Sequence, residues 1–236
     1  MDTVSIGRLF EGFFVVAHRG ASGYEPENTL RAVRRALEMG VDAVEVDVRL
    51  SADGVPVVIH DETLERTTSG RGRVRDYPVD ELRMLDAGSG ERIPLLAEVL
   101  DEVKGKAALF LELKEVEAAA PSLSLVEEKG MLGDVLFISL QPEALAEVRR
   151  MSPRAYLGLI YFKPGEWILE AKRLGCSFVL PHYRLATEKA VSFAHRLKLR
   201  VVAWTVDDPA TAAELKKRGV DGVASNFPDR ILPLRG

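Results

Sequence analysis

The chain of 236 residues carries 32 basic and 36 acidic side chains, a formal net charge of −4, and 47% of its residues are hydrophobic. This length and apolar content suit one α/β barrel domain over residues 1–236. The charge balance excludes a global basic field for nucleic acid or an anionic membrane surface, so a small anionic ligand would need local cations.

Near the N-terminus, residues 1–12 include Asp2, Arg8 and Glu11 and lack the apolar stretch of a signal peptide, which favours a cytoplasmic protein. No apolar run approaches the roughly 18 residues that a membrane span needs. The single cysteine, Cys176, lies in an apolar run, where a buried structural thiol is a simpler interpretation than a nucleophile. We therefore expect neither a membrane span nor a disulfide.

Apolar β-branched runs alternate with amphipathic stretches along the chain, a rhythm typical of parallel strands joined by helices. Strands are predicted over residues 13–17, 42–49, 107–113, 134–139, 155–160, 176–181, 200–206 and 221–225. Helices are predicted over 28–39, 95–103, 121–130, 142–150, 165–174, 187–197 and 209–218, with a short one after Pro228. These eight units predict a TIM (β/α)8 barrel.

Helix ends and starts have recognisable residues. A glycine stands where three helices are expected to end, each just before a strand: Gly40, Gly175 and Gly219. Asp208 precedes Pro209, the pattern of an N-cap followed by proline at the first helical position. Asn28 can cap the first helix in the same way.

One segment breaks the βα rhythm, because only residues 51–54 separate the second strand from the next apolar run, 55–59. Asp-Gly between two such runs predicts an antiparallel hairpin. A four-residue loop would place His60 opposite Glu45, and a two-residue loop would place it opposite Asp47. Either register brings the histidine back to the carboxylates.

Residues 61–93 contain no second long apolar run and are rich in small polar residues. We interpret them as a short insertion above the barrel mouth, too small to be a domain with its own core. The insertion could form a substrate wall or lid.

Several apolar runs end on polar side chains, which hydrophobic burial alone does not explain. These are His18 with Arg19, Glu45 with Asp47, His60 with Asp61, and Glu112 with Lys114. A two-residue spacing puts Glu45 and Asp47 on one face of their strand, and likewise Glu112 and Lys114. Three carboxylates from two strands predict a hard oxygen site for one divalent ion, Mg²⁺ or Ca²⁺.

The remaining polar groups suit phosphoryl chemistry. His18 and His60 can divide the proton transfers, one as base and one as acid. Arg19 and Lys114 can hold phosphate oxygens as charge grows on them. Each residue also has a structural alternative: a lone histidine is often only hydrogen-bonded, Lys114 could merely pair with Glu112, and Trp204 could be core. His182 and His195 are interpreted as structural.

The order of the motifs strongly resembles the glycerophosphodiester phosphodiesterases. They read H-R-G-A-S-G-Y-E-P-E-N-T, E-V-D-V, D-G-V-P-V-V-I-H-D-E-T-L-E-R-T-T-S-G, L-E-L-K, A-W-T-V and D-G-V-A-S-N-F-P-D, and they cover nearly the whole chain. The resemblance implies a phospholipase C-like phosphodiesterase barrel that uses a divalent metal to cleave glycerophosphodiesters to sn-glycerol 3-phosphate and an alcohol, in lipid and glycerol metabolism.

The resemblance also assigns roles to residues. It implies catalytic histidines at His18 and His60, and metal carboxylates at Glu45, Asp47 and Glu112. Substrate contacts are implied for Arg19, Lys114, Trp204 and, beside the site, Glu27. The chain has Ser139-Leu140 where many members carry Ser-Phe, and Ser225-Asn226 where many carry Thr-Asp.

Other functions stay open from the sequence. Lysophospholipase D or sphingomyelinase D-like activity on the same barrel would need an apolar mouth, for which the candidate aromatics are Tyr161, Phe162 and Phe227. A noncatalytic barrel that binds phosphodiesters would require the loss of a metal ligand or a histidine, and none is missing. A nucleotide-sugar transferase that uses the E-x-D motif as its metal site is a poorer hypothesis, because it gives no role to His18 or His60. The leaving alcohol and the oligomeric state are left open.

Overall fold

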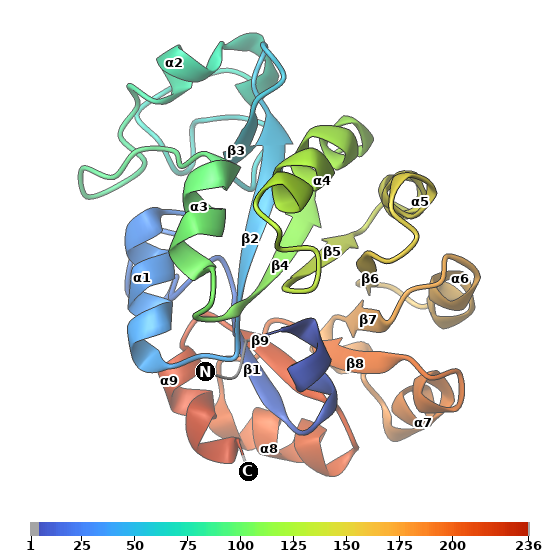
Figure 1. Cartoon of the computed structure of the whole chain (residues 1–236). Coiled ribbons are helices and arrows are strands. Elements are labelled where there is room, and N and C mark those ends of the chain that lie inside the picture. Colours follow the sequence, from blue (N-terminus) through green and yellow to red (C-terminus); the bar gives the residue numbers. More distant parts are fainter. Residues whose placement is uncertain (1–4, 236) are drawn as a thin grey trace.

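A closed parallel barrel forms the centre of the computed structural model, which describes residues 5–235 (Figure 1). Residues 1–4 and 236 of the expected 1–236 domain lie outside the described residues. The first and last strands of the barrel, β1 and β9, pair with each other, and β1 also pairs with β2, which closes the ring. The predicted TIM barrel is confirmed. Its parallel strands are β1 (Phe14–Ala17), β2 (Ala43–Leu50), β4 (Ala108–Leu113), β5 (Val135–Ser139), β6 (Tyr156–Tyr161), β7 (Phe178–Pro181), β8 (Arg200–Ala203) and β9 (Gly222–Ser225).

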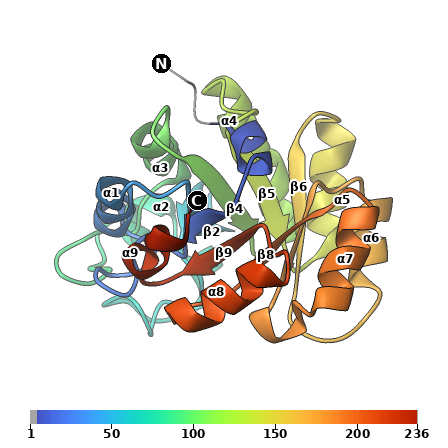
Figure 2. The ribbon, with the colours of Figure 1, turned by 90° about the horizontal axis from the view of Figure 1, so that it is seen from below.

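Helices surround the strands in both views (Figures 1 and 2). The α-helices are α1 (Leu30–Met39), α2 (Val79–Leu82), α3 (Leu96–Val103), α4 (Ala119–Glu128), α5 (Pro142–Met151), α6 (Trp167–Arg173), α7 (Glu188–Arg196), α8 (Pro209–Lys217) and α9 (Pro228–Ile231). Short 3₁₀ turns are η1 (Ile6–Phe10), η2 (Val74–Asp76), η3 (Val116–Ala118), η4 (Tyr183–Leu185) and η5 (Leu232–Leu234). Most bounds agree with the sequence to within a few residues, and β8 ends three residues earlier than expected.

Apolar residues form an inner and an outer layer because strand side chains alternate between the two faces. Phe110, Phe178 and Leu136 belong to the cluster inside the barrel, where η1 contributes Ile6. The neighbouring positions on the strands face outward and pack with the helices in a larger cluster. Side chains thus fill the barrel interior. The polar residues of β2 and β4 lie beyond this apolar cluster, toward the carboxyl ends of the strands.

The hairpin is present, but both expected registers are wrong. β3 (Pro56–Val58) pairs antiparallel to β2 with Leu50 opposite Pro56 and Val48 opposite Val58. This leaves a five-residue loop, because the Ser51 side chain and backbone both bond Val55 and close a wider turn. The ladder therefore ends before His60, which leaves the strand and reaches the mouth from a loop.

Residues 61–93 project to one side of the barrel beside β3, with α2 at the top of Figure 1. This segment buries a small apolar cluster together with β3 and so shares its apolar contacts with the barrel hairpin. Its members are Val57, Ile59, Leu64, Val74, Leu82, Ala87 and Ile93. The apolar residues are scattered singly along the sequence, so no run revealed them.

The helix junctions confirm most of the expected caps. Gly40 ends α1 in the left-handed conformation with φ 76°, and the Asp208 side chain accepts a hydrogen bond from Thr211 N at the start of α8. The expected cap at Asn28 is wrong, because Thr29 is the N-cap of α1 and accepts from Ala32 N. Asn28 is thereby free for another role. Within residues 5–235, the helices are too short or too polar to cross a bilayer.

Candidate active site

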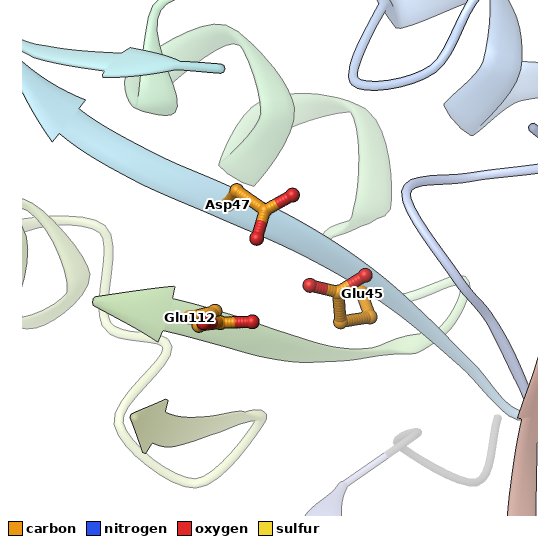
Figure 3. A group of neighbouring side chains, drawn as sticks. All are labelled: Glu45, Asp47 and Glu112. Atoms are coloured by element: carbon orange, nitrogen blue, oxygen red, sulfur yellow. The ribbon is translucent and has the colours of Figure 1, made fainter. Parts of the chain in front are cut away.

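Three carboxylates meet inside the barrel near the carboxyl ends of two neighbouring strands. Glu45 and Asp47 lie on β2 and Glu112 on β4, and the strand register places Asp47 opposite Glu112. Because side chains alternate along a strand, all three point to the same face. One ligating oxygen from each lies within 4.8 Å of the others. Figure 3 shows the three side chains gathered between the two strands.

The electrostatics of this acidic cluster favour a cation. Burial, followed by the charges of Asp47 and Glu112, raises the pKa of Glu45 well above its usual range. Burial and the charge of Asp47 raise the pKa of Glu112 to about 7. Oε1 of Glu45 is buried without a hydrogen-bond partner among the described residues. An acidic, all-oxygen donor set with an unpartnered buried oxygen fits a hard divalent cation.

Two basic side chains stand beside the carboxylates. Lys114 Nζ lies 2.7 Å from Glu112 Oε1 and 3.4 Å from Asp47 Oδ1, and Arg19 Nε lies 3.3 Å from Asp47 Oδ2. Burial alone would raise the pKa of Asp47, but Lys114 and Arg19 outweigh it and hold that pKa well below its usual range. Asp47 therefore stays ionised, whereas Glu45 and Glu112 retain protons more readily.

Arg19 links the acidic cluster to the loop that precedes α1. Its backbone lies in the left-handed region with φ 56°, which non-glycine residues rarely adopt. This conformation lets the Arg19 N–H donate to Glu45 Oε2 at 2.8 Å while the guanidinium Nη1 donates to Glu27 Oε1 at 2.8 Å. One residue thus supports a candidate metal ligand with its backbone and keeps its charge at the mouth.

The two histidines reach one hollow from different segments. His18 follows β1, and its backbone N–H extends the ladder to Ser225 O. His60 follows β3. Both line a hollow of about 500 Å³, including its opening to solvent, together with Arg19, Glu45, Glu112 and Lys114. Burial is the largest influence on both histidines and lowers the pKa of each.

Each histidine has a different partner on its Nδ1 atom. His18 Nδ1 lies 2.8 Å from the amide Oδ1 of Asn226. His60 Nδ1 lies 2.6 Å from the carboxylate Oδ1 of Asp61. Both rings are therefore oriented by a hydrogen bond on Nδ1, and Nε2 is the nitrogen left for chemistry.

A chain of ion pairs connects the two sides of the mouth. Arg66, from the insertion, donates from Nη1 and Nη2 to the Glu27 carboxylate at 2.8 Å each. Its Nε and Nη2 also donate to Asp61 at 2.6 and 2.9 Å. Since Asp61 orients His60 and Glu27 holds Arg19, Arg66 joins the partners of two expected site residues.

The opposite wall of the hollow is apolar. The residues come from the ends of β5 to β9 and include Ile138, Leu140, Ile160, Leu180, Trp204 and Ala224. Trp204 donates from Nε1 to Leu180 O at 2.7 Å, which orients its ring. The hollow therefore has one charged side and one apolar side.

Not every expected residue lies at the mouth. Tyr161 was a candidate for an apolar substrate wall, and this is wrong: it is 7% exposed and packs in the outer layer between strands and helices. Phe227 packs edge-on against Tyr24. Phe162 follows β6 and is 58% exposed. Of these aromatics, Phe162 is exposed, Phe227 is partly buried and Tyr161 is buried.

Three further residues agree with their structural interpretation. His195 Nε2 lies 2.8 Å from Asp221, which precedes β9 and so lies at the opposite end of the barrel. The His182 ring packs against Trp204 with centroids 5.7 Å apart. Burial raises the pKa of the Cys176 thiol to about 12, which leaves it a poor nucleophile.

Sequence reasoning missed several polar partners of the site. Asn28 donates from Nδ2 to Asp47 Oδ2 at 2.8 Å, and Asp47 N donates back to Asn28 Oδ1 at 3.1 Å. Arg66 stood only as a letter of a motif, and Asp61 was noted beside His60 at the end of an apolar run without a role. A signal was available for Asp61 and Arg66, which are polar residues of the H-D…R-T-T motif that no cap or turn explains, whereas Asn28 was interpreted as a helix cap.

The fold and the site define a class: a TIM-barrel phosphoric diester hydrolase with an acidic cluster, basic residues and histidines at the carboxyl ends of its strands. The sequence profile of the Glycerophosphoryl diester phosphodiesterase family matches residues 18–230. The chain belongs to this family and is an enzyme of this kind.

Individual relatives agree over nearly the whole chain. The glycerophosphodiester phosphodiesterase of Caldanaerobacter subterraneus subsp. tengcongensis is 35% identical, with 93% of this chain and 96% of that protein covered. A phosphodiesterase of Oleispira antarctica, solved with the product sn-glycerol-3-phosphate, is 33% identical with a TM-score of 0.90, covering 95% of this chain and 98% of that one. The glycerophosphodiester phosphodiesterase of Agrobacterium tumefaciens is 31% identical with a TM-score of 0.83, covering 94% and 99%.

Proposed function

We propose that the protein hydrolyses glycerophosphodiesters to sn-glycerol 3-phosphate and an alcohol, with one divalent cation held by Glu45, Asp47 and Glu112. The observation that carries this proposal is the convergence of the acidic cluster and both histidines on one hollow. The product bound to the Oleispira antarctica relative supports sn-glycerol 3-phosphate as the retained half. Mg²⁺ and Ca²⁺ both suit the all-oxygen donor set.

The basic residues bind the phosphate in this proposal. Arg19 and Lys114 face the hollow and can donate to its nonbridging oxygens, where negative charge increases in the transition state. The bound cation would add positive charge beside the same oxygens. Lys114 is largely buried and its charge is balanced by Asp47 and Glu112, so its ammonium is held in place.

The histidines transfer the protons. A bond forms between phosphorus and an attacking hydroxyl oxygen of water or substrate, and the bond from phosphorus to the departing alcohol breaks. One histidine Nε2 takes the proton of the attacking hydroxyl, and the other gives a proton to the leaving alkoxide. Their low pKa values keep a neutral, basic form available near neutral pH.

The direct test measures release of glycerol 3-phosphate from glycerophosphocholine, with and without a chelator. We expect release that the chelator abolishes and that Mg²⁺ or Ca²⁺ restores. A parallel assay measures choline release from a lysophospholipid. Release from neither substrate in the presence of metal would reject both the proposed activity and its lipid alternative.

The lipid alternative rests on the apolar rim. Phe162 and Leu140 are both partly or largely exposed beyond β6 and β5, as an acyl-binding surface requires. Tyr161, however, is buried in the outer layer. The diester activity is therefore the better supported of the two.

The acid–base roles lead to a prediction about turnover. His18→Ala and His60→Ala are each expected to lower kcat by roughly 10²- to 10⁴-fold, because each removes a proton-transfer group. His195→Gln is the matched control, since this histidine lies at the other end of the barrel. Circular dichroism monitors the fold, and near wild-type turnover in either alanine variant would overturn that histidine's role.

A further inference from the structure

Asn226 lies between His18 and the carboxylate of Asp207. Its Oδ1 lies 2.8 Å from His18 Nδ1, and its Nδ2 donates to Asp207 Oδ2 at 2.8 Å. Asp207 Oδ1 also accepts from the backbone N–H of Asn226 at 2.8 Å and from Ser225 Oγ at 2.9 Å. Asp207 lies in the loop between β8 and α8, and Asn226 directly follows β9.

These contacts determine which way the amide faces. A carboxylate only accepts hydrogen bonds, so the NH₂ group of Asn226 must face Asp207 and its oxygen must face His18. An amide oxygen also only accepts, so His18 Nδ1 must carry the hydrogen. Neutral His18 then has its lone pair on Nε2. The direction of each hydrogen bond in this series follows from the Asp207 carboxylate at its end.

We propose that Asn226 and Asp207 are positioning residues that hold His18 in the tautomer with hydrogen on Nδ1 and with Nε2 available for proton transfer. Neither residue touches the substrate in this proposal. It rests on the proposed role of His18 in the reaction, although the tautomer itself can be tested separately.

The position of the negative charge distinguishes the two histidines. Asp61 places a carboxylate directly on His60, whereas at His18 an amide intervenes and the carboxylate stands one side chain further away. The amide orients the ring without adding a charge beside it. A carboxylate at 226, where many members of the resembled family carry Asp, would orient the ring and also favour its protonated form.

A purely structural alternative must be separated from this role. The same bonds tie the loop after β8 to the end of β9, so their loss could simply loosen two loops. A structural role would lower the melting temperature and activity together. A positioning role affects the tautomer of His18 and the pH profile, which loop packing does not control.

The first measurement is the ¹⁵N spectrum of the histidine side chains in the wild-type protein. The chain has four histidines, and the His18 signals are identified as those absent from His18→Gln. We expect neutral His18 to carry its hydrogen on Nδ1, and the Asp207→Asn variant to lose this preference. Hydrogen on Nε2 in the wild type would overturn the proposal, whatever the enzyme's activity.

The second measurement compares kinetic variants. Asn226→Leu removes the acceptor and is expected to lower kcat between about tenfold and a thousandfold with little change in KM, because the histidine remains but loses its orientation. Asp207→Asn is expected to lower kcat by less. Asp208→Asn is the matched control: it makes the same charge change at the neighbouring position, which caps α8 and does not contact Asn226.

The decisive variant exchanges the two side chains, Asn226→Asp with Asp207→Asn. This exchange keeps an acceptor on His18 Nδ1 and a donor–acceptor pair behind it, but moves the negative charge onto the imidazole. Arg19, Asp47 and Glu27 act on His18 through their charges, and they are unchanged in this variant. The other titratable groups of the hollow are also unchanged: Glu45, His60, Glu112 and Lys114.

We expect the exchange variant to have a kcat well above that of Asn226→Leu, because an acceptor again faces His18 Nδ1. The limb of the kcat/KM profile that His18 contributes is expected to move to higher pH by about one unit or more. An unshifted profile, or activity that merely follows the melting temperature across all variants, would reject the positioning role.

Discussion

Asn28 has a left-handed backbone with φ 57° and exchanges two hydrogen bonds with Asp47. The bond from Nδ2 leaves one Asp47 oxygen facing the acidic cluster, so Asn28 orients a proposed metal ligand. Partners of this kind typically change metal affinity about 10- to 100-fold when they are removed. We therefore predict that Asn28→Gly weakens binding of Mg²⁺ or Ca²⁺ by about this factor, as measured by calorimetry.

Glycine is the informative replacement because it accepts a positive φ without strain, whereas alanine would add a backbone penalty. Ser69→Gly serves as a control on loop flexibility, because Ser69 lies in the insertion away from the acidic cluster. Unchanged metal affinity in Asn28→Gly would show that Asp47 does not need this partner.

At the residue scale, the sequence indicated the charged groups on strands and just beyond strand ends, but not the polar partners that hold them from the loops. Glu45, Asp47 and Glu112 could be placed together because strand periodicity and strand order suffice. The role of Asn28 depends on a left-handed turn that no local pattern revealed. Asn226 acquires its role only through Asp207, nineteen positions away along the chain.

At the scale of elements, the insertion is tied to the barrel through Arg66. The guanidinium holds Asp61 beside His60 and Glu27 beside Arg19. Side-chain hydrogen bonds from Arg66 hold the pKa of Asp61 well below its usual range. We predict that Arg66→Leu lowers kcat by about tenfold. This is the lower end of the effect expected for the loss of one charged hydrogen bond, because the Arg66 side chain is half-exposed.

The control for this variant is Arg73→Leu in the same insertion. Arg73 pairs with Glu62 at 3.5 Å and both side chains are well exposed, so its loss is expected to leave kcat unchanged. Steady-state kinetics on glycerophosphocholine compare the two. Equal activity of both variants would mean that the insertion does not act on the histidines through Arg66.

The ends of β5 to β8 lead to a prediction about selectivity. They supply Ile138, Leu140, Ile160, Leu180 and Trp204 to the hollow. Apolar contacts separate similar groups by only about 1 to 3 kcal/mol, whereas hydrogen-bonded recognition of hydroxyls is far stricter. We therefore expect relaxed choice among choline, ethanolamine and glycerol as leaving groups, with the glycerol phosphate half held firmly.

This prediction is checked by comparing kcat/KM for the three glycerophosphodiesters with that for bis(p-nitrophenyl) phosphate, which contains no glycerol. Values for the three are expected within about tenfold of one another, and the glycerol-free diester is expected to be much poorer. If it is cleaved as efficiently, a general phosphodiesterase is the better description.

The order of elements was predictable because each βα unit carries its own local signals, as Gly40 and Asp208 show. The register of β3 was not. It depends on Ser51, whose side chain bonds Val55 and widens the loop by one residue beyond the expected four. A one-residue change is invisible in apolar periodicity but moves every facing pair.

At the scale of the whole molecule, the barrel concentrates acidic groups at one end, and folding must overcome their repulsion. Burial and Asp47 raise the pKa of Glu112 to about 7 from its usual 4.5. Between these two values the folded protein binds more protons at this group than the unfolded chain. Without metal, this group's contribution to stability therefore falls as pH rises from about 4.5 to 7.

Metal binding is expected to reverse this trend, because a cation replaces the protons and binds the ionised carboxylates. We predict that saturating Mg²⁺ or Ca²⁺ raises the melting temperature by roughly 5 to 10 °C at pH 8, the effect of a free concentration near 100 times Kd on a chain of this size. At pH 5.5 the increase is expected to be much smaller, because protons compete for Glu45 and Glu112. Thermal melts with metal and with chelator at both pH values measure the difference.

Glu112→Gln is expected to lose most of the metal-induced rise in melting temperature, because it removes one of the three carboxylates. Glu147→Gln, which alters a surface pair with Arg150 on α5, is expected to keep that rise. An equal metal-induced increase at both pH values would contradict the coupling between protons and metal at this site.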